Sequence, residues 1–256
     1  MEINIDGQKI NYINKGKGKT VLLLHGWGVN INLYKNIIDN MSKYSNVYAL
    51  DMPGFGKSDE PKEIWDLDNY VELVEEFINK LKLNNLILIG HSFGGRIIIK
   101  MASKNALKFK ISRIILLGSA GIKHKLSLKK AIKVKTYKIC KKIISSKFIN
   151  KIFPNLVNNV KNKFGSEDYK NASQIMRGCL VKVINEDLSE LLKYINYNTL
   201  LIWGTEDKAT PLEDGRKMHK LIENSTLIEI QGATHYAFLE KPLYINKVID
   251  KFIMNS

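Results

Sequence analysis

The chain has 256 residues, of which 45% are hydrophobic, enough to bury the core of one large domain and to exclude an intrinsically disordered protein. Its formal net charge is +15, from 40 basic and 25 acidic residues. No apolar run is long enough to span a membrane, and Met1–Ile10 lacks the apolar core of a secretion signal, so we expect a cytoplasmic protein. Cys140 and Cys179 have no metal-ligand or redox spacing, and we interpret both as thiols in a reducing compartment.

Strand-like and helix-like segments alternate over the first 121 residues. Glu2–Ile5 and Lys9–Ile13 alternate apolar and polar residues on either side of Asp6-Gly7, which predicts an antiparallel hairpin at a sheet edge. The next expected strands are Thr20–Leu24, Val47–Leu50, Asn85–Ile89 and Ser112–Leu117, and the expected helices are Leu33–Met41, Asp68–Leu81 and Gly95–Ala102. This alternation predicts parallel strands joined by right-handed crossovers.

The alternation stops at Gly118–Gly121 and resumes after Asn198. Residues 122–198 have helical spacing and no clear strand. After them come a strand, a helix, a strand and a helix, expected at Thr199–Trp203, Pro211–Ile222, Thr226–Ile230 and Leu243–Ile253. We therefore predict an α/β core from residues 1–121 and 199–256, with about eight mostly parallel strands flanked by helices. Residues 122–198 are predicted to form an inserted helical cap over the open edge of the sheet.

The positive charge is concentrated in this predicted cap. Residues 122–198 contain 17 Lys and Arg against 5 acids, and thirteen lysines occur between Lys123 and Lys163 without one acid. A genome-wide preference for lysine would not remove acids from one segment. We expect a surface that attracts an anionic partner, such as an acidic carrier protein, a coenzyme-A thioester or an anionic membrane face; a solvated lysine face without a partner is the alternative. The lysines come without a nucleic-acid-binding motif, so no nucleic-acid partner is expected.

The strongest motif is Gly90-His91-Ser92-Phe93-Gly94, which follows the predicted strand Asn85–Ile89 and precedes a helical segment. The pattern G-x-S-x-G alone occurs by chance in roughly one chain in ten of this length. A strand before it and a helix after it are typical of a nucleophile elbow, in which flanking glycines allow a sharp turn that presents the serine above the sheet. The helix N-terminus also stabilises negative charge that develops there. Ser92 is therefore predicted to be a nucleophile.

Two further motifs follow later predicted strands. Gly204–Asp207 brings two carboxylates, Glu206 and Asp207, to the end of one strand, and Gly232–His235 brings a histidine to the end of the last one. Because the carboxyl ends of parallel strands meet at one edge of a sheet, we expect these groups near Ser92. Nucleophile, acid and histidine, in this order along the chain, match one known order of the Ser-His-Asp triad, and either carboxylate fits that pattern.

Two glycine-containing loops complete the pattern. His25-Gly26-Trp27-Gly28 follows the strand Thr20–Leu24, and Asp51–Ser58 has the form D-x-P-G-x-G-x-S. With the elbow and the two later motifs, these loops resemble the α/β-hydrolase superfamily over essentially the whole chain outside the predicted cap. The HGWG and GHSFGG motifs are also similar to those of carboxylesterases such as the pimeloyl-acyl-carrier-protein methyl ester esterases.

The resemblance implies a role for each motif. The backbone N–H groups of Trp27 and Phe93 are expected to form the oxyanion hole. The superfamily pattern G-x-x-D favours Asp207 over Glu206 as the acid that orients the general base His235. Some relatives carry the acid after the sixth strand, but Gly118–Ala120 contains no carboxylate. His25 is expected to tie down its loop, Asp51–Ser58 to be structural, and no metal or cofactor is implied.

The implied function is a serine hydrolase that cleaves a carboxylic ester or thioester of a small-molecule acyl substrate through an acyl-enzyme on Ser92. Aminopeptidases, carbon–carbon bond hydrolases and cofactor-free haloperoxidases of this superfamily share the triad. Receptor-like proteins of this superfamily, which bind a ligand and turn it over slowly, also retain the triad. Serine at the elbow disfavours the dehalogenases and epoxide hydrolases of this fold, which resemble it but use aspartate there.

Overall fold

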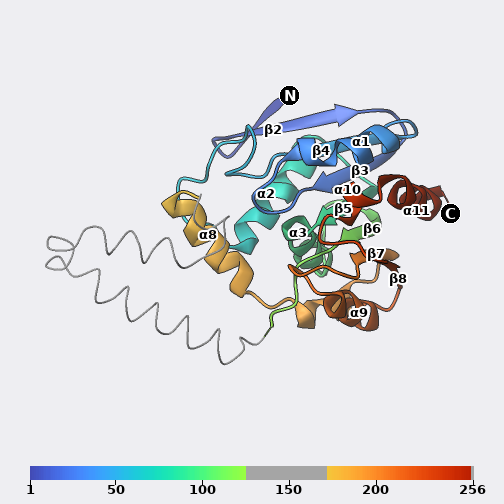
Figure 1. The fold of residues 1–256 in the computed structure, drawn as a ribbon. Coiled ribbons are helices and arrows are strands. Elements are labelled where there is room, and N and C mark those ends of the chain that lie inside the picture. The colour runs from blue at the N-terminus through green and yellow to red at the C-terminus, as the bar shows by residue number, and fades with distance from the viewer. Residues whose placement is uncertain (125–171, 255–256) are drawn as a thin grey trace, which may run out of the picture.

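The computed structural model describes residues 1–124 and 172–254 and shows an eight-stranded sheet with helices on both faces (Figure 1). The strands are β1 (Glu2–Ile5), β2 (Gln8–Lys15), β3 (Lys19–Leu24), β4 (Ser45–Leu50), β5 (Leu86–His91), β6 (Ile111–Leu117), β7 (Thr199–Gly204) and β8 (Ser225–Ile230). The helices are the 3₁₀ segments η1 (Ile31–Tyr34) and η2 (Ser189–Tyr194), and α1 (Lys35–Met41), α2 (Leu67–Lys80), α3 (Phe93–Ala102), α8 (Gln174–Asn185), α9 (Leu212–Leu221), α10 (Ala237–Glu240) and α11 (Pro242–Met254).

The strand order is β1-β2-β4-β3-β5-β6-β7-β8, and all neighbours from β4 to β8 are parallel. The predicted eight-stranded, mostly parallel α/β architecture is thus confirmed. The predicted hairpin is confirmed too, because β1 and β2 pair antiparallel with Ile5 opposite Gln8. Asp6 and Gly7 both have positive φ, 50° and 80°, as a two-residue type I′ turn requires.

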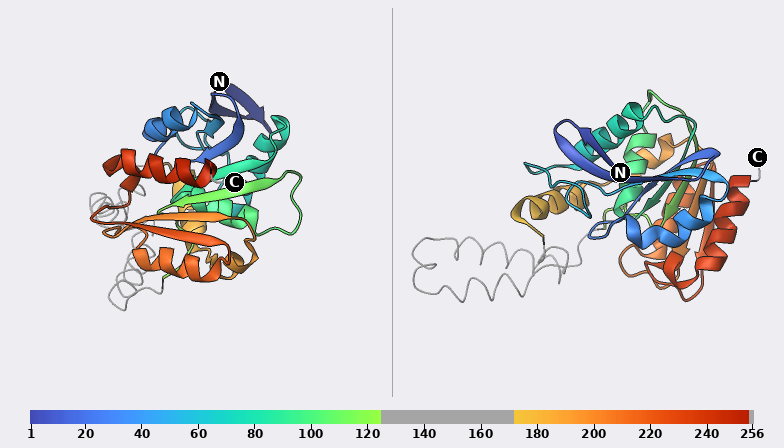
Figure 2. Two further views of the ribbon diagram at one scale, coloured as in Figure 1. Left: turned by 90° about the vertical axis from the view of Figure 1, so that its right-hand side faces the viewer. Right: turned by 90° about the horizontal axis from the view of Figure 1, so that it is seen from above.

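Alternate residues of the central strands enter two separate cores. Leu22 and Leu24 of β3 pack with α2, α3 and α9, whereas Val21 and Leu23 pack with α1 and α11. This follows from the two-residue side-chain period of a strand buried on both faces. Figure 2 shows α1 and α11 on one side of the sheet, with α2 and α3 on the other. No helix in the described residues is long and apolar enough to cross a membrane.

Of the predicted cap, only residues 122–124 and 172–198 are described. Ser173 caps the N-terminus of α8, and Met176 and Cys179 of this helix are buried against the α2 side of the core. The Cys179 Sγ accepts a hydrogen bond from the Trp65 N–H at 3.1 Å, and burial raises the pKa of this thiol. Residues 125–171, with Cys140 and most of the lysines between Lys123 and Lys163, lie outside the described residues, so the cap stays a prediction.

The chain leaves the sheet at Gly121 and, after α8, returns towards it at Leu188, and these two residues are in contact. The Leu188 N–H donates to the Gly121 carbonyl at 2.9 Å. Just before the return point, the Glu186 carboxylate binds the Lys100 ammonium group of α3 at 2.6 Å. The two junctions of the intervening segment therefore occupy one place, next to α3, the helix that follows Ser92.

Candidate active site

Ser92 lies between β5 and α3 in a backbone conformation that L-residues rarely adopt. Its φ of 50° and ψ of −108° fall outside the favoured regions, as at many functional turns. Close packing enforces the turn: a Cβ on Gly94 would lie 2.1 Å from the Leu24 carbonyl oxygen, and one on Gly90 would lie 2.7 Å from the Gly95 nitrogen. The two glycines of the elbow are thus sterically required, while the Ser92 side chain stays partly exposed.

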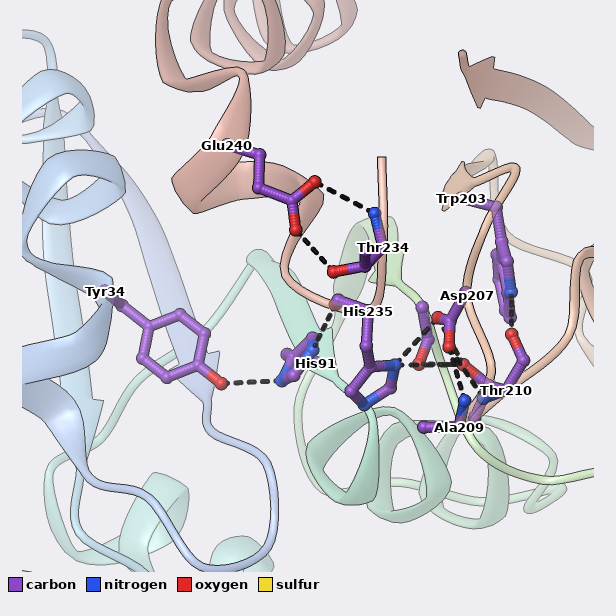
Figure 3. A network of polar contacts seen from close by, with 10 residues as sticks. Tyr34, His91, Trp203, Asp207, Ala209, Thr210, Thr234, His235 and Glu240 are labelled. Atoms are coloured by element: carbon purple, nitrogen blue, oxygen red, sulfur yellow. Dashed lines mark hydrogen bonds and ion pairs between the residues drawn. The ribbon is translucent and has the colours of Figure 1, made fainter. Parts of the chain in front are cut away.

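The structure brings Asp207 and His235 together at the carboxyl ends of β7 and β8 (Figure 3). The His235 Nδ1–H donates to Asp207 Oδ2 at 2.7 Å, which leaves Nε2 unprotonated and able to accept a proton. Burial alone would raise the pKa of Asp207, but its hydrogen bonds from His235 and Thr210 outweigh this effect and lower the pKa. The carboxylate is therefore ionised at neutral pH, as a partner of imidazolium must be.

Glu206, the competing carboxylate, takes no part in this pair within the described residues. Its side chain is exposed, and its backbone N–H donates to the Ala233 carbonyl at 2.9 Å. Within the described residues, the structure thus joins His235 to Asp207 and not to its neighbour.

Thr210 is a part of the site that the sequence reasoning missed. Its hydroxyl lies 2.9 Å from Asp207 Oδ2 and 3.2 Å from His235 Nδ1, and its backbone N–H donates to Asp207 Oδ1 at 2.9 Å. The Ala209 N–H donates to the same oxygen at 2.8 Å. This ring of donors holds the carboxylate in one orientation. A hydroxyl residue three positions after the acid was the available sequence signal.

His91 connects the elbow to the histidine loop. Its Nε2–H donates to the His235 carbonyl at 3.1 Å, and its Nδ1 accepts from the Tyr34 hydroxyl at 2.8 Å (Figure 3). The Tyr34 oxygen in turn accepts the Gly26 N–H at 3.0 Å. The ring centroids of His91 and His235 are 4.6 Å apart, so the residue that precedes Ser92 packs against the histidine. This chain of contacts joins the loops after β3, β5 and β8.

The Ser92 hydroxyl has no hydrogen bond to His235 in the part of the chain that the structure describes. The described residues also contain no cluster of three His, Cys, Asp or Glu side chains that could hold a metal ion.

The rings of Trp27 and Phe93 pack edge-to-face with centroids 5.1 Å apart. Among the described residues, neither backbone N–H has an acceptor, so both remain available to a ligand oxygen. The loop that carries Trp27 is fixed by His25, whose Nδ1–H donates to the Gly26 carbonyl at 2.6 Å and whose Nε2 accepts the Met52 N–H at 2.8 Å. His25 thus ties down its loop, as expected.

The loop Asp51–Ser58 supports the same region without presenting a reactive group. Asp51 accepts backbone hydrogen bonds from Ile31 and Lys57, each at 2.9 Å, and Gly56 packs against its carboxylate. Beside this loop, a cleft of about 320 Å³ opens next to Trp27. Phe55, Glu60, Ser173 and Met176 contribute to its walls.

Acid is expected to destabilise the fold through His91. Burial first, and then the charge of His235, lower the pKa of His91 to about 3, whereas an unfolded histidine titrates near 6.5. Below pH 6.5, His91 is therefore protonated in the unfolded chain but stays neutral in the folded one, and the free energy of unfolding falls as the pH drops towards 3. Between pH 7 and pH 5 this group should remove about 2 kcal/mol.

Urea unfolding at both pH values measures this effect. Between pH 7 and pH 5, the fall in the free energy of unfolding should be about 2 kcal/mol smaller in His91→Gln than in the parent. In His219→Gln, which changes an exposed histidine, the fall should be the same as in the parent. Equal losses in the parent and in His91→Gln would contradict the assignment.

Comparison with known proteins places this geometry in a family. The α/β-hydrolase fold family model matches residues 19–242. The pimeloyl-[acyl-carrier protein] methyl ester esterase of Wigglesworthia glossinidia brevipalpis is 29% identical, with 93% of this chain and 95% of that protein covered. The 2-hydroxy-6-oxo-6-(2'-aminophenyl)hexa-2,4-dienoic acid hydrolase of Metapseudomonas resinovorans is 25% identical, with coverages of 94% and 86%.

A solved structure agrees with these sequence relatives. The esterase EaEST of Exiguobacterium antarcticum superposes with a TM-score of 0.75 at 25% identity, covering 97% of each chain. The family match spans both the elbow and the Asp207–His235 pair. The chain therefore belongs to the α/β-hydrolase family.

Proposed function

We propose that this hydrolase cleaves a carboxylic ester through an acyl-enzyme intermediate on Ser92. The observation that carries the proposal is the pair Asp207–His235 at 2.7 Å, held beside a strained serine turn. The backbone N–H groups of Trp27 and Phe93, which have no acceptor among the described residues, lie close by. A base, a nucleophile and two oxyanion donors are the groups that acyl transfer requires.

In the proposed mechanism, His235 Nε2 removes the Ser92 proton as Oγ attacks the substrate carbonyl carbon. The tetrahedral oxyanion accepts hydrogen bonds from the N–H groups of Trp27 and Phe93, and ionised Asp207 stabilises the imidazolium. The imidazolium then gives its proton to the leaving alcohol as the carbon–oxygen bond breaks. Water, deprotonated by the same histidine, attacks the acyl-enzyme and releases the carboxylic acid and free Ser92.

The names of the relatives support a carboxylic ester as the bond that this protein cleaves. One nearly full-length relative is named a methyl ester esterase, and the superposed structure is an esterase. A carbon–carbon bond hydrolase is the second candidate, because the Metapseudomonas relative is named a hydrolase of a hexadienoic acid. Both reactions would use the same serine, histidine and aspartate.

Release of p-nitrophenol from p-nitrophenyl butyrate tests the proposal. We expect many equivalents per protein, since water regenerates Ser92 after each acylation, and no release after pretreatment with a fluorophosphonate. A single equivalent without turnover would instead indicate a receptor-like protein that is acylated once. Turnover that survives fluorophosphonate treatment would contradict a serine nucleophile.

A further inference from the structure

A second groove lies between α11 and the edge strand β8, at the opposite end of the strands from Asp207 and His235. It has a volume of about 630 Å³ and reaches Asn198 and Leu200 at the start of β7. The pairing of Leu200 with Thr226 places both strands in its wall. This volume lies within the range of about 300–1,000 Å³ that is typical of small-molecule sites.

The groove exists because α11 presents two apolar stripes. Ile245, Ile249 and Ile253 are buried in the core, whereas Tyr244, Val248 and Phe252, also four residues apart, face the groove. Opposite them, Thr226 and Ile228 are on the same face of β8 because they are two residues apart. In the part of the chain that the structure describes, β8 is the last strand of the sheet, so no neighbouring strand pairs with its outer edge.

Exposed apolar side chains gather on the same helix. Leu243, Tyr244 and Met254 are 86%, 55% and 57% exposed. Leu243 and Tyr244 are at the start of α11 and Met254 is at its end, so the groove runs between exposed apolar positions.

The charge at the groove has one sign. Lys247 and Lys251, one helical turn apart, lie along the groove, and neither ammonium group has an ion-pair or hydrogen-bond partner in the described residues. No acidic residue is among those described in its walls. At one end, the Arg113 guanidinium lies 5.6 Å from the Phe252 ring centroid. An apolar floor with a cationic rim fits a ligand that has an alkyl chain and an anionic head.

We propose that this groove binds a single-chain alkyl carboxylate, with the chain along Val248, Phe252 and Ile228 and the carboxylate at Lys247 and Lys251. A second copy of the chain fits less well. A two-fold contact through β8 would bring the same unpaired lysines of both copies towards one axis, where they repel. The inference is independent of the ester hydrolysis proposed for Ser92.

Calorimetric titration with decanoate, below its micelle concentration, tests the site. Exposed ion pairs are individually weak, so Lys247→Gln/Lys251→Gln should raise the Kd about fivefold. Lys82→Gln/Lys220→Gln removes the same charge at exposed lysines outside the groove and should change nothing. Decanol, which has the same chain without the charge, should bind the parent about fivefold more weakly than decanoate.

Acidic substitutions in the groove give a sharper test. Val248→Glu should weaken decanoate binding more than tenfold, and Thr226→Glu, on the exposed edge strand, should do the same without disturbing the helix. Ester turnover should be unchanged in both variants, and their thermal unfolding shows whether they fold. A diazirine-bearing decanoate should label peptides of α11 or β8.

Four results would overturn the proposal. Label confined to the cleft beside Trp27, or a Kd unaffected by Thr226→Glu, would place the carboxylate elsewhere. Equal affinity for decanol and decanoate would show that the lysines do not bind the head group. Sedimentation that reveals a dimer abolished by Thr226→Glu would identify the groove as an interface between copies. None of these outcomes depends on whether Ser92 is acylated.

Discussion

Replacement of Ser92 by alanine is expected to lower kcat/KM for p-nitrophenyl esters by at least about a thousandfold, because the nucleophile is lost. Fluorophosphonate labelling should disappear together with turnover. The variant should fold, since the Ser92 side chain makes no hydrogen bond within the described residues and only one oxygen is removed.

The matched control is Ser103→Ala, at the other end of α3, where the hydroxyl donates to the Lys100 carbonyl. This control should retain both labelling and turnover. If purified, folded Ser92→Ala hydrolysed esters at the parental rate, the proposed mechanism would be wrong.

Replacement of Asp207 by asparagine should lower kcat by about 10⁴-fold. The amide side chain would offer an N–H or a neutral oxygen to His235 Nδ1, so the histidine loses both the correct tautomer and the charge that stabilises imidazolium. Thr210 and the Ala209 N–H, which now bind the ionised carboxylate, would remain as partners of a neutral amide.

Glu206→Gln provides the comparison at the adjacent position. Because the Glu206 side chain is exposed, this variant should change kcat less than about threefold. Steady-state kinetics of both purified variants at one pH gives the ranking. A larger loss in Glu206→Gln than in Asp207→Asn would show that the wrong carboxylate has been assigned.

Local patterns were sufficient to predict the sheet and the placing of its polar loops. The β1–β2 turn was readable because Asp-Gly interrupts two alternating segments, and β5 because a short apolar run ends at the Gly90–Gly94 motif. Helix ends were predicted less well: α3 begins at Phe93, two residues before the expected start, since its first turn belongs to the elbow. The four-residue helix α10 is too short for any periodic signal.

Contacts between distant side chains could not be predicted in the same way. Tyr34 binds His91, 57 residues later, through a geometry that only the assembled sheet creates. The spacing of apolar residues along α11 likewise does not predict whether Val248 is covered by a neighbouring element or lines a groove. The roles of Ser92, Asp207, His235, Trp27 and Phe93 remain predictions that kinetics must test.

The contact between Gly121 and Leu188 has a consequence for how such a protein can change over evolutionary time. Since the segment between them starts and ends at one hydrogen-bonded point, a change in its length need not move β6 and β7, although a new segment must still cover the core where Met176 and Cys179 of α8 are buried. Loop-closure entropy is also permissive, because each doubling of a flexible loop costs only about 0.6 kcal/mol. The junction thus acts as an exchange point at which insertions of very different length and composition can be accepted, while the strands that carry Ser92, Asp207 and His235 keep their register.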